Sequence, residues 1–255
     1  MDSQFTLQSS MYFLRRDPLY DSEKVYEIRR KELKAGIPRT NADLEKVEGI
    51  CIQNMRGMNP SLAEHGFCCM NLDTNLQPED FQNESRIVEE YFPKLTQAVK
   101  ASLGADRIQI YDFIRRKRHP DFPKRVGNID GVSQPATSAH IDETQADAKR
   151  VLQKINPTEF SSLSKMRWQV LIAWHPIRGP VRDWPLAVCD RRSVNVGADL
   201  QPCDLIHPNH ISEEYKVHYA TEQKWYYLQD QMPNEVFLLL QADSEGSTGL
   251  QFPTS

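Results

Sequence analysis

The longest uninterrupted apolar runs in this chain are only five residues long, at Val170–Trp174 and Val236–Leu240. A helix that crosses a membrane needs roughly 20 apolar residues, so neither run predicts a membrane span. Short apolar runs bounded by turn residues are typical of β-strands. The chain must therefore build its core from many short segments.

Most of these segments lie in the second half of the chain. The expected strands are Trp168–Trp174, Leu186–Cys189, Tyr215–Tyr219, Lys224–Leu228 and Glu235–Gln241. A further strand is expected over Asp106–Phe113, where apolar and polar residues alternate.

Two helices are expected between and before these strands. Ile87, Tyr91, Leu95 and Val99 recur at spacings of four before Gly104, which stands where a helix C-cap belongs. Pro93 interrupts that pattern and predicts either a kink or the start of a second helix. The other helix covers about Thr144–Ile155, with Thr144 as N-cap and Asp147 three residues later.

The N-terminal part is expected to differ from the rest. Residues 1–103 are polar and rich in helix breakers, with a possible helix around Ser22–Leu33, so this part is predicted to be mostly helical or irregular. Residues 104–255 are predicted to form a β-rich core. No linker or repeat divides the chain, so 1–255 is expected to be one domain.

Charge and cysteine content exclude several classes of protein. The formal net charge is −4, which is small and of the wrong sign for a general nucleic-acid binder. The first residues show no basic segment followed by an apolar stretch, as a secretory signal would. The five cysteines form no C-x-x-C pair and are expected to be reduced thiols. We expect a cytoplasmic protein with neither nucleic-acid nor membrane partners.

His140 and Asp142 are the candidate metal ligands. In an extended strand, residues i and i+2 point to the same face, so both side chains can reach one ion. An imidazole, a carboxylate and a distant second imidazole form the facial triad of non-haem Fe(II) oxygenases. The alternative is a surface pair in which Asp142 helps to cap the following helix.

Other histidines give weaker signals. His218 lies in an expected strand and is a candidate distal ligand, or else a half-buried strand histidine. Cys203, His207 and His210 match no common zinc spacing and are expected to lie in a loop.

Arg115–Arg125 is a basic stretch with six positive residues and one Asp. A solvated face is the usual explanation. The sharper hypothesis is a binding site for an acidic substrate or a carboxylate cosubstrate, with Arg115 and Arg116 as the candidates, since Arg binds carboxylates in a bidentate manner.

Several stretches, read together, resemble the fungal asaB-type hydroxylase/desaturase family, which also includes bacterial CmcJ-like cephalosporin methoxylation proteins. The resemblance is collinear and covers nearly the whole chain. The stretches that carry it are Gly104–Arg116 (GADRIQIYDFIRR), His140–Thr144 (HIDET), Ala173–Asp190 (AWHPIRGPVRDWPLAVCD) and Trp225–Ser244 (WYYLQDQMPNEVFLLLQADS).

The resemblance implies a mainly β fold with flanking helices (α+β) around a double-stranded β-helix, or jelly-roll, core. It implies an oxidoreductase of the non-haem iron dioxygenase type that uses Fe(II) and 2-oxoglutarate. Such an enzyme hydroxylates or desaturates a small intermediate of secondary-metabolite biosynthesis. His140 and Asp142 then correspond to the first two iron ligands.

The sequence also departs from the family pattern. Glu143 stands where the family has Tyr in H-x-D-Y-T, and His175 stands where it has Arg in W-R-P-I. The family continues after Asp-Ser with segments expected to carry the distal iron ligand and a cosubstrate-binding arginine. Here Glu245–Ser255 contains no His and no Arg.

This departure leaves three explanations open. The sequence is cut short, so that the jelly roll is incomplete at its C-terminus and a complete protein would finish the site. Alternatively, His218 replaces the missing ligand. In the third explanation the protein is a truncated pseudoenzyme or a metabolite-binding protein on the same fold.

Overall fold

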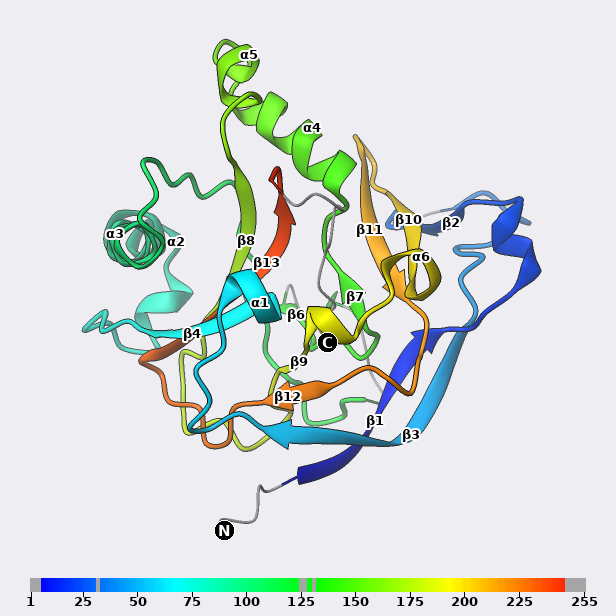
Figure 1. Cartoon of the computed structure of the whole chain (residues 1–255), viewed down its shortest axis with the longest axis horizontal. Helices are drawn as coiled ribbons and strands as arrows, with labels where there is room; N and C mark the ends of the chain where they lie inside the picture. Colours follow the sequence, from blue (N-terminus) through cyan, green and yellow to red (C-terminus); the bar gives the residue numbers. More distant parts are fainter. Residues whose placement is uncertain (1–5, 31–32, 124–127, 130–131, 246–255) are drawn as a thin grey trace.

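The computed structural model describes residues 6–30, 33–123, 128–129 and 132–245, and these form three β-sheets with helices at their edges (Figure 1). The first sheet has the strand order β1 (Thr6–Leu14), β3 (Leu44–Asn54), β12 (Trp225–Tyr227) and β9 (Ala187–Cys189). The second has the order β2 (Val25–Ile28), β10 (Leu200–Ile206), β11 (Ile211–Val217) and β7 (His140–Ile141). The third has the order β4 (Phe67–Asn71), β13 (Glu235–Asp243) and β8 (Gln169–Trp174).

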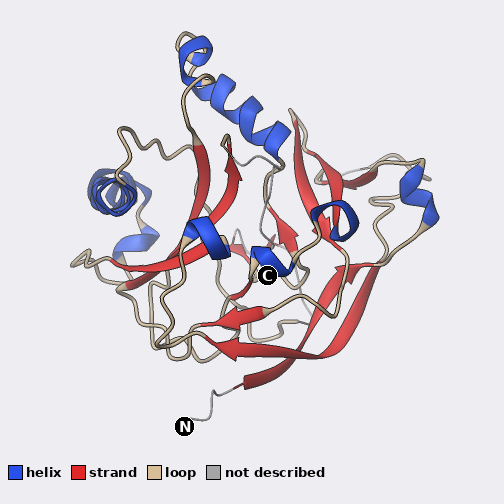
Figure 2. Cartoon of the chain, viewed as in Figure 1, coloured by secondary structure: helices blue, strands red, loops and turns tan. Residues whose placement is uncertain are grey.

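The remaining elements are short. A two-stranded ladder joins β5 (Asn128–Ile129) to β6 (Val132–Ser133). The α-helices, blue in Figure 2, are α1 (Leu62–His65), α2 (Glu84–Arg86), α3 (Phe92–Leu103), α4 (Gln145–Ile155), α5 (Phe160–Leu163) and α6 (Val196–Asp199). The single-turn helices are η1 (Pro18–Asp21), η2 (Asp80–Gln82), η3 (Ile87–Tyr91) and η4 (Arg191–Ser193). None of the described helices is long and apolar enough to cross a membrane.

Strand β13 is the central strand of its sheet and contacts two hydrophobic clusters. Its residues Val236, Leu238 and Leu240 pack toward helix α3, and Phe237 and Leu239 pack toward β9 and β12. All five are at most 2% exposed. A strand that is buried on both faces has no polar alternation, and this explains the uninterrupted apolar run Val236–Leu240.

The strands predicted in the second half are confirmed with small shifts of their ends. Elements β8, β9, β12 and β13 lie where strands are predicted. Strand β11 ends at Val217, so His218 follows the strand rather than lying in it.

The two predicted helices are also confirmed. Helix α4 begins after Thr144, whose hydroxyl accepts the Asp147 N–H. Around Pro93 the chain forms the π-turn η3 and then starts α3 with Pro93 in its first turn, so a second helix begins there. Gly104 ends α3 in the left-handed conformation, at φ 62°, that glycine adopts most readily.

The N-terminal part contains strands that the sequence does not predict, because residues 1–103 include β1, β2, β3 and β4 alongside helical and irregular segments. In place of the helix around Ser22–Leu33, the described residues form η1 and then β2, which pairs with β10. Their partners lie far along the chain: β3 pairs with β12 and β4 pairs with β13. Whether such a segment forms a strand depends on the strands it meets in the folded protein, so its local residue propensities do not predict it.

The strand predicted over Asp106–Phe113 is also wrong. The segment has no strand assignment, although Ile108 and Ile110 pack against the cluster around α3 and β13. One-sided packing produces the alternating pattern, but a strand also requires a neighbour to accept its backbone hydrogen bonds.

Candidate active site

His140 is the first residue of β7, the edge strand that pairs with β11, and Asp142 follows this strand shortly before helix α4 (Figure 1). Nε2 of His140 is 3.4 Å from Oδ1 of Asp142. Nδ1 of His140 donates a hydrogen bond to the backbone carbonyl of Ser138, at 2.7 Å. His140 is buried, whereas the Asp142 side chain is 44% exposed, so the pair is open to solvent on the carboxylate side.

The charges around this pair stabilise its ionised form. Burial opposes protonation of His140, but Asp142 and then Glu214 outweigh burial and raise the imidazole pKa. Burial also opposes ionisation of Asp142, but His140 and the more distant Arg116 and Arg29 hold its pKa below the usual range. The carboxylate is therefore anionic at neutral pH.

The two side chains fit a divalent iron ion as ligands. The Ser138 carbonyl holds the proton on Nδ1, so Nε2, on the side of Asp142, is the nitrogen that would lose its proton to bind a metal ion. A second hydrogen bond of this kind is the usual way in which proteins orient a metal-binding imidazole. Imidazole nitrogen and carboxylate oxygen are the donors that non-haem Fe(II) sites use.

The neighbouring strand β11 places a buried ion pair on the same face. Lys216 lies opposite His140 in the antiparallel register, and Glu214 lies two residues earlier, on the same side of the strand. The Lys216 Nζ is 2.6 Å from Oε1 of Glu214, and both side chains are almost fully buried. Burial opposes the charge on Lys216, but Glu214 outweighs it and raises the pKa of the ammonium.

Helix α4 is tied to β11 immediately after Asp142. The backbone N–H of Thr144 donates to the Glu213 carbonyl, at 2.9 Å, and the backbone N–H of Glu213 donates to the Asp147 carboxylate, at 2.8 Å. The Thr144 hydroxyl donates to the Glu213 carboxylate, which Lys24 also contacts. These reciprocal bonds limit the conformations open to the turn that carries Asp142.

The adjacent arginines Arg115 and Arg116 point to different places. Arg115 donates to the carbonyl of Phe81, at 2.9 Å, next to helix α2. Arg116 donates to the carbonyl of Gln134, at 2.8 Å, and its charge reaches Asp142. Only Arg116 of this pair is therefore placed to act near the His140–Asp142 motif, while Lys124 and Arg125 of the basic stretch lie outside the described residues.

His218 does not join the His140–Asp142 pair. Its Nδ1 donates to the Leu14 carbonyl, at 2.8 Å, and its backbone N–H donates to the carbonyl of Asp199. Among the residues that the structure describes, no three His, Cys, Asp or Glu side chains are gathered closely enough to hold a metal ion. His218 as the third ligand therefore stays a prediction, because only its Nδ1 is used to tie the end of β11 to β1.

The other histidines have structural partners as well. His207 and His210 stack at 4.3 Å with nearly parallel rings in the turn between β10 and β11, as expected for a loop. The same prediction is wrong for Cys203, which is buried inside strand β10. His175, at the position where the family pattern has Arg, stacks on Tyr91 and lies 2.9 Å from its hydroxyl.

Tyr111, Gln241 and Arg29 are neighbours of the site that the sequence does not predict. The Tyr111 hydroxyl donates to Glu143, whose pKa burial raises to about 7. Gln241 accepts a hydrogen bond from Asp142, and Arg29 contributes positive charge. The sequence identifies Glu143 only as a departure from the family pattern and does not predict its contact with Tyr111. No short-range sequence signal points to Gln241 or Arg29, since each reaches the site across tertiary contacts.

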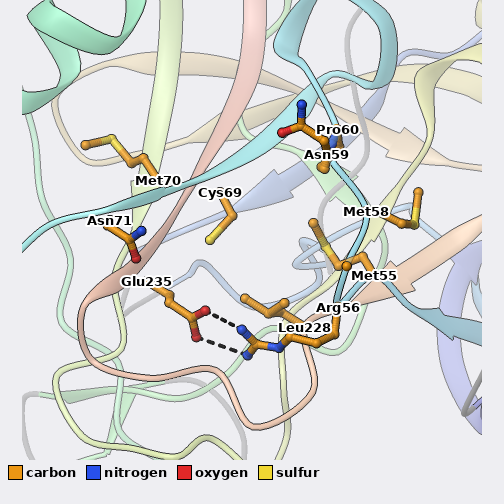
Figure 3. A pocket seen from close by; sticks show the side chains of 11 residues that line it. Met55, Arg56, Met58, Asn59, Pro60, Cys69, Met70, Asn71, Leu228 and Glu235 are labelled. Atoms are coloured by element: carbon orange, nitrogen blue, oxygen red, sulfur yellow. Dashed lines mark hydrogen bonds and ion pairs between the residues drawn. The ribbon is translucent and has the colours of Figure 1, made fainter.

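A small cavity of about 170 Å³ lies elsewhere, between the end of β3 and the start of β13 (Figure 3). Its lining is rich in sulfur, with Met55, Met58, Cys69 and Met70, and the Arg56–Glu235 ion pair closes one side. Glu235 stands six residues before Gln241 on β13, so this cavity is about 20 Å from the His140–Asp142 motif. It is a separate feature of the fold.

Comparison with known proteins gives concordant matches. A family model described as an oxidoreductase/YMDC permease-like domain matches residues 11–254. The hydroxylase/desaturase efuI of Hormonema carpetanum is 30% identical over 205 residues, which cover 72% of this chain and 67% of efuI. The alpha-ketoglutarate-dependent dioxygenase phiK of a fungal species (strain ATCC 74256) is 28% identical over 222 residues, which cover 86% of this chain and 78% of phiK.

The fold has a close counterpart among solved structures. A variant of the iron and alpha-ketoglutarate-dependent endoperoxidase NvfI superposes with a TM-score of 0.86 and 25% identity, over 100% of this chain and 90% of that chain. This match confirms the mainly β fold with flanking helices and the jelly-roll core. The chain therefore belongs to the asaB-type hydroxylase/desaturase family, a family of oxidoreductases that use Fe(II) and 2-oxoglutarate.

Proposed function

We propose that this chain binds Fe(II) through His140 and Asp142 and uses 2-oxoglutarate to hydroxylate or desaturate a small organic molecule. The observation that carries the proposal is the motif itself, with Nε2 of His140 3.4 Å from Oδ1 of Asp142 and the opposite ring nitrogen held by Ser138. The names of the matched relatives support the same cofactors and reaction class.

Bound iron and 2-oxoglutarate would supply the activation of oxygen that oxidation of an unactivated C–H bond requires. The chain's own residues would bind the metal ion and orient its ligands. The imidazole is held in one tautomer, and Asp142 remains a carboxylate because the positive charges of Arg116 and Arg29 favour its anion. We assign to Arg116 the recognition of a carboxylate on the cosubstrate or substrate, supported by the effect of its positive charge on the Asp142 carboxylate.

We further propose that the substrate is an intermediate of secondary-metabolite biosynthesis, in keeping with the relatives' names, and that the protein is cytoplasmic. All five cysteines are free thiols, which supports a reducing compartment. We also propose that 1–255 is a single domain, supported by sheets that combine strands from both halves of the chain.

Anaerobic titration with Fe(II) and 2-oxoglutarate tests the proposal directly. We expect a weak visible charge-transfer band in the wild type that is lost in His140→Ala and in Asp142→Ala. His210→Ala removes an imidazole from the surface turn and serves as the matched control, in which the band should persist. A wild type that shows no band and no binding at millimolar 2-oxoglutarate would contradict the proposal and favour a metabolite-binding protein on the same fold.

The role of His218 can be tested in the same titration. His218→Asn retains an N–H donor toward the Leu14 carbonyl but provides no imidazole. Because no three potential ligands that include His218 are gathered among the described residues, we expect the charge-transfer band to remain. Loss of the band without loss of folding would instead restore His218 as an iron ligand.

A further inference from the structure

Gln241 is a fully buried polar side chain inside the most apolar strand of the protein. It follows the run Val236–Leu240 in β13 and is 0% exposed. Its amide oxygen accepts the backbone N–H of Asp142 at 3.1 Å. A backbone N–H can only donate, so the oxygen rather than the nitrogen of the amide must face Asp142.

A β-bulge gives Gln241 its direction. The pairing of β13 with β8 shifts register between Leu240 and Ala242, which leaves Gln241 as the extra residue. A bulge breaks the regular alternation of side chains and re-aims the inserted residue, a device common beside active sites. Here the side chain reaches β7, which belongs to a different sheet.

The end of β13 holds the turn after Asp142 at a second point. The Gln145 side-chain amide, in the first turn of α4, donates to the backbone carbonyl of Asp243 at 3.2 Å. Two residues of one buried strand therefore contact both ends of the turn from Asp142 to α4. The strand itself is rigid, because it is the central strand of its sheet.

We propose that Gln241 is a positioning residue for the metal site, which holds the Asp142 carboxylate in register with His140 through the Asp142 backbone N–H. This inference rests on the proposed function, because it takes Asp142 to be an iron ligand. Its physical basis is that the Asp142 side chain is 44% exposed, so the core does not enclose it on every side to define its direction. Its backbone must then be held by a group anchored in the core.

The competing role for Gln241 is structural, since burial of an unpaired N–H costs free energy at any position. Gln231 offers a matched control for that role. It is 1% exposed, and its side-chain amide donates to the backbone carbonyl of Glu235 at 2.7 Å, at the opposite end of β13. Gln231→Met and Gln241→Met make the same chemical change at equal burial, and only the second touches Asp142.

Binding of Mn(II) to the full chain, followed by electron paramagnetic resonance, provides the test, because Mn(II) accepts the same nitrogen and oxygen donors as Fe(II). We expect Gln241→Met to weaken Mn(II) binding about tenfold, the usual cost of losing an outer-shell partner. The spectrum of the ion that remains bound should also broaden, since the carboxylate is no longer held in one position. Gln231→Met should leave both the affinity and the spectrum unchanged, and Gln241→Glu, which keeps an acceptor at the same reach, should restore them.

The outcomes separate the two claims. If Gln241→Met and Gln231→Met both retain wild-type affinity, or lose the same fraction of it in step with thermal stability, Gln241 is structural and the inference is overturned. If the wild type binds no Mn(II), or His140→Ala binds as well as the wild type, the proposed metal site fails and this inference fails with it. Loss of affinity in His140→Ala and Gln241→Met, but not in Gln231→Met, supports both.

Discussion

At the residue scale, the role of a charged side chain in the site is set by the groups it contacts more than by its residue type. Arg115 and Arg116 are adjacent residues of one type, yet one guanidinium donates to the Phe81 carbonyl and the other acts on Asp142. Successive residues of an extended segment point to opposite sides, so a basic run delivers only part of its charge to any one site.

Arg115 and Arg116 therefore form a matched pair for a binding experiment. We expect Arg116→Gln to raise the Kd for 2-oxoglutarate about tenfold, because a hydrogen bond to a charged group contributes about 1.5–3 kcal/mol. Arg115→Gln should change this Kd little. Isothermal titration of both variants in the presence of Mn(II) measures the difference, and equal effects would show that only bulk charge matters.

At the element scale, the junction between α4 and β11 determines where the motif stands. Glu213 accepts the Thr144 hydroxyl, contacts Lys24, and donates its own N–H to Asp147. Burial would raise the pKa of the Glu213 carboxyl, but Lys24 and Thr144 outweigh burial and lower it below 4.5. A depressed folded-state pKa means that the anion stabilises the folded state.

The sign of the pH dependence follows from this shift. The contribution of Glu213 is complete above the ordinary pKa of 4.5 and is lost as the pH falls through the lower folded-state value. Glu213→Gln should lower the free energy of unfolding at pH 7 by about 1–3 kcal/mol and flatten its decline below pH 4.5. Urea denaturation between pH 3 and 7 measures both, with the exposed Glu222→Gln as control. A variant with the wild-type slope would show that the junction does not depend on this charge.

At the scale of the whole molecule, the N-terminal strands belong to the same structure as the C-terminal ones. Phe13 of β1 is 0% exposed, and its ring lies 5.4 Å from Tyr219 and 6.0 Å from Trp225. Strand β3 pairs with both β1 and β12, so the first sheet cannot form from either half alone.

Truncation of this contact should be costly. Phe13→Ala is expected to lower the free energy of unfolding by about 3–5 kcal/mol, as for other large aromatic side chains in a core. Tyr12 is the neighbouring residue on the opposite face and is 37% exposed, so Tyr12→Ala should cost far less. Guanidinium denaturation of the two variants provides the comparison. Similar losses would mean that β1 contributes little to the core.

The predictions from sequence succeeded where local pattern and tertiary environment agree. Helix α4 carries its own cap in Thr144 and Asp147, and Gly104 ends α3, because these signals act within a few residues. The buried run of β13 could form only an interior element. The N-terminal strands could not be foreseen, because β2, β3 and β4 each pair with a strand more than a hundred residues away.

The chain's residues alone specified a mainly β protein with two capped helices, no long apolar segment, and a His-x-Asp motif able to bind a metal. The tertiary structure decided which polar groups surround that motif: Arg116, the Lys216–Glu214 pair and Gln241. The physical reason is range. Capping and alternation are short-range properties of neighbouring residues, whereas the direction of a buried side chain depends on strand register, on a bulge and on partners from distant segments.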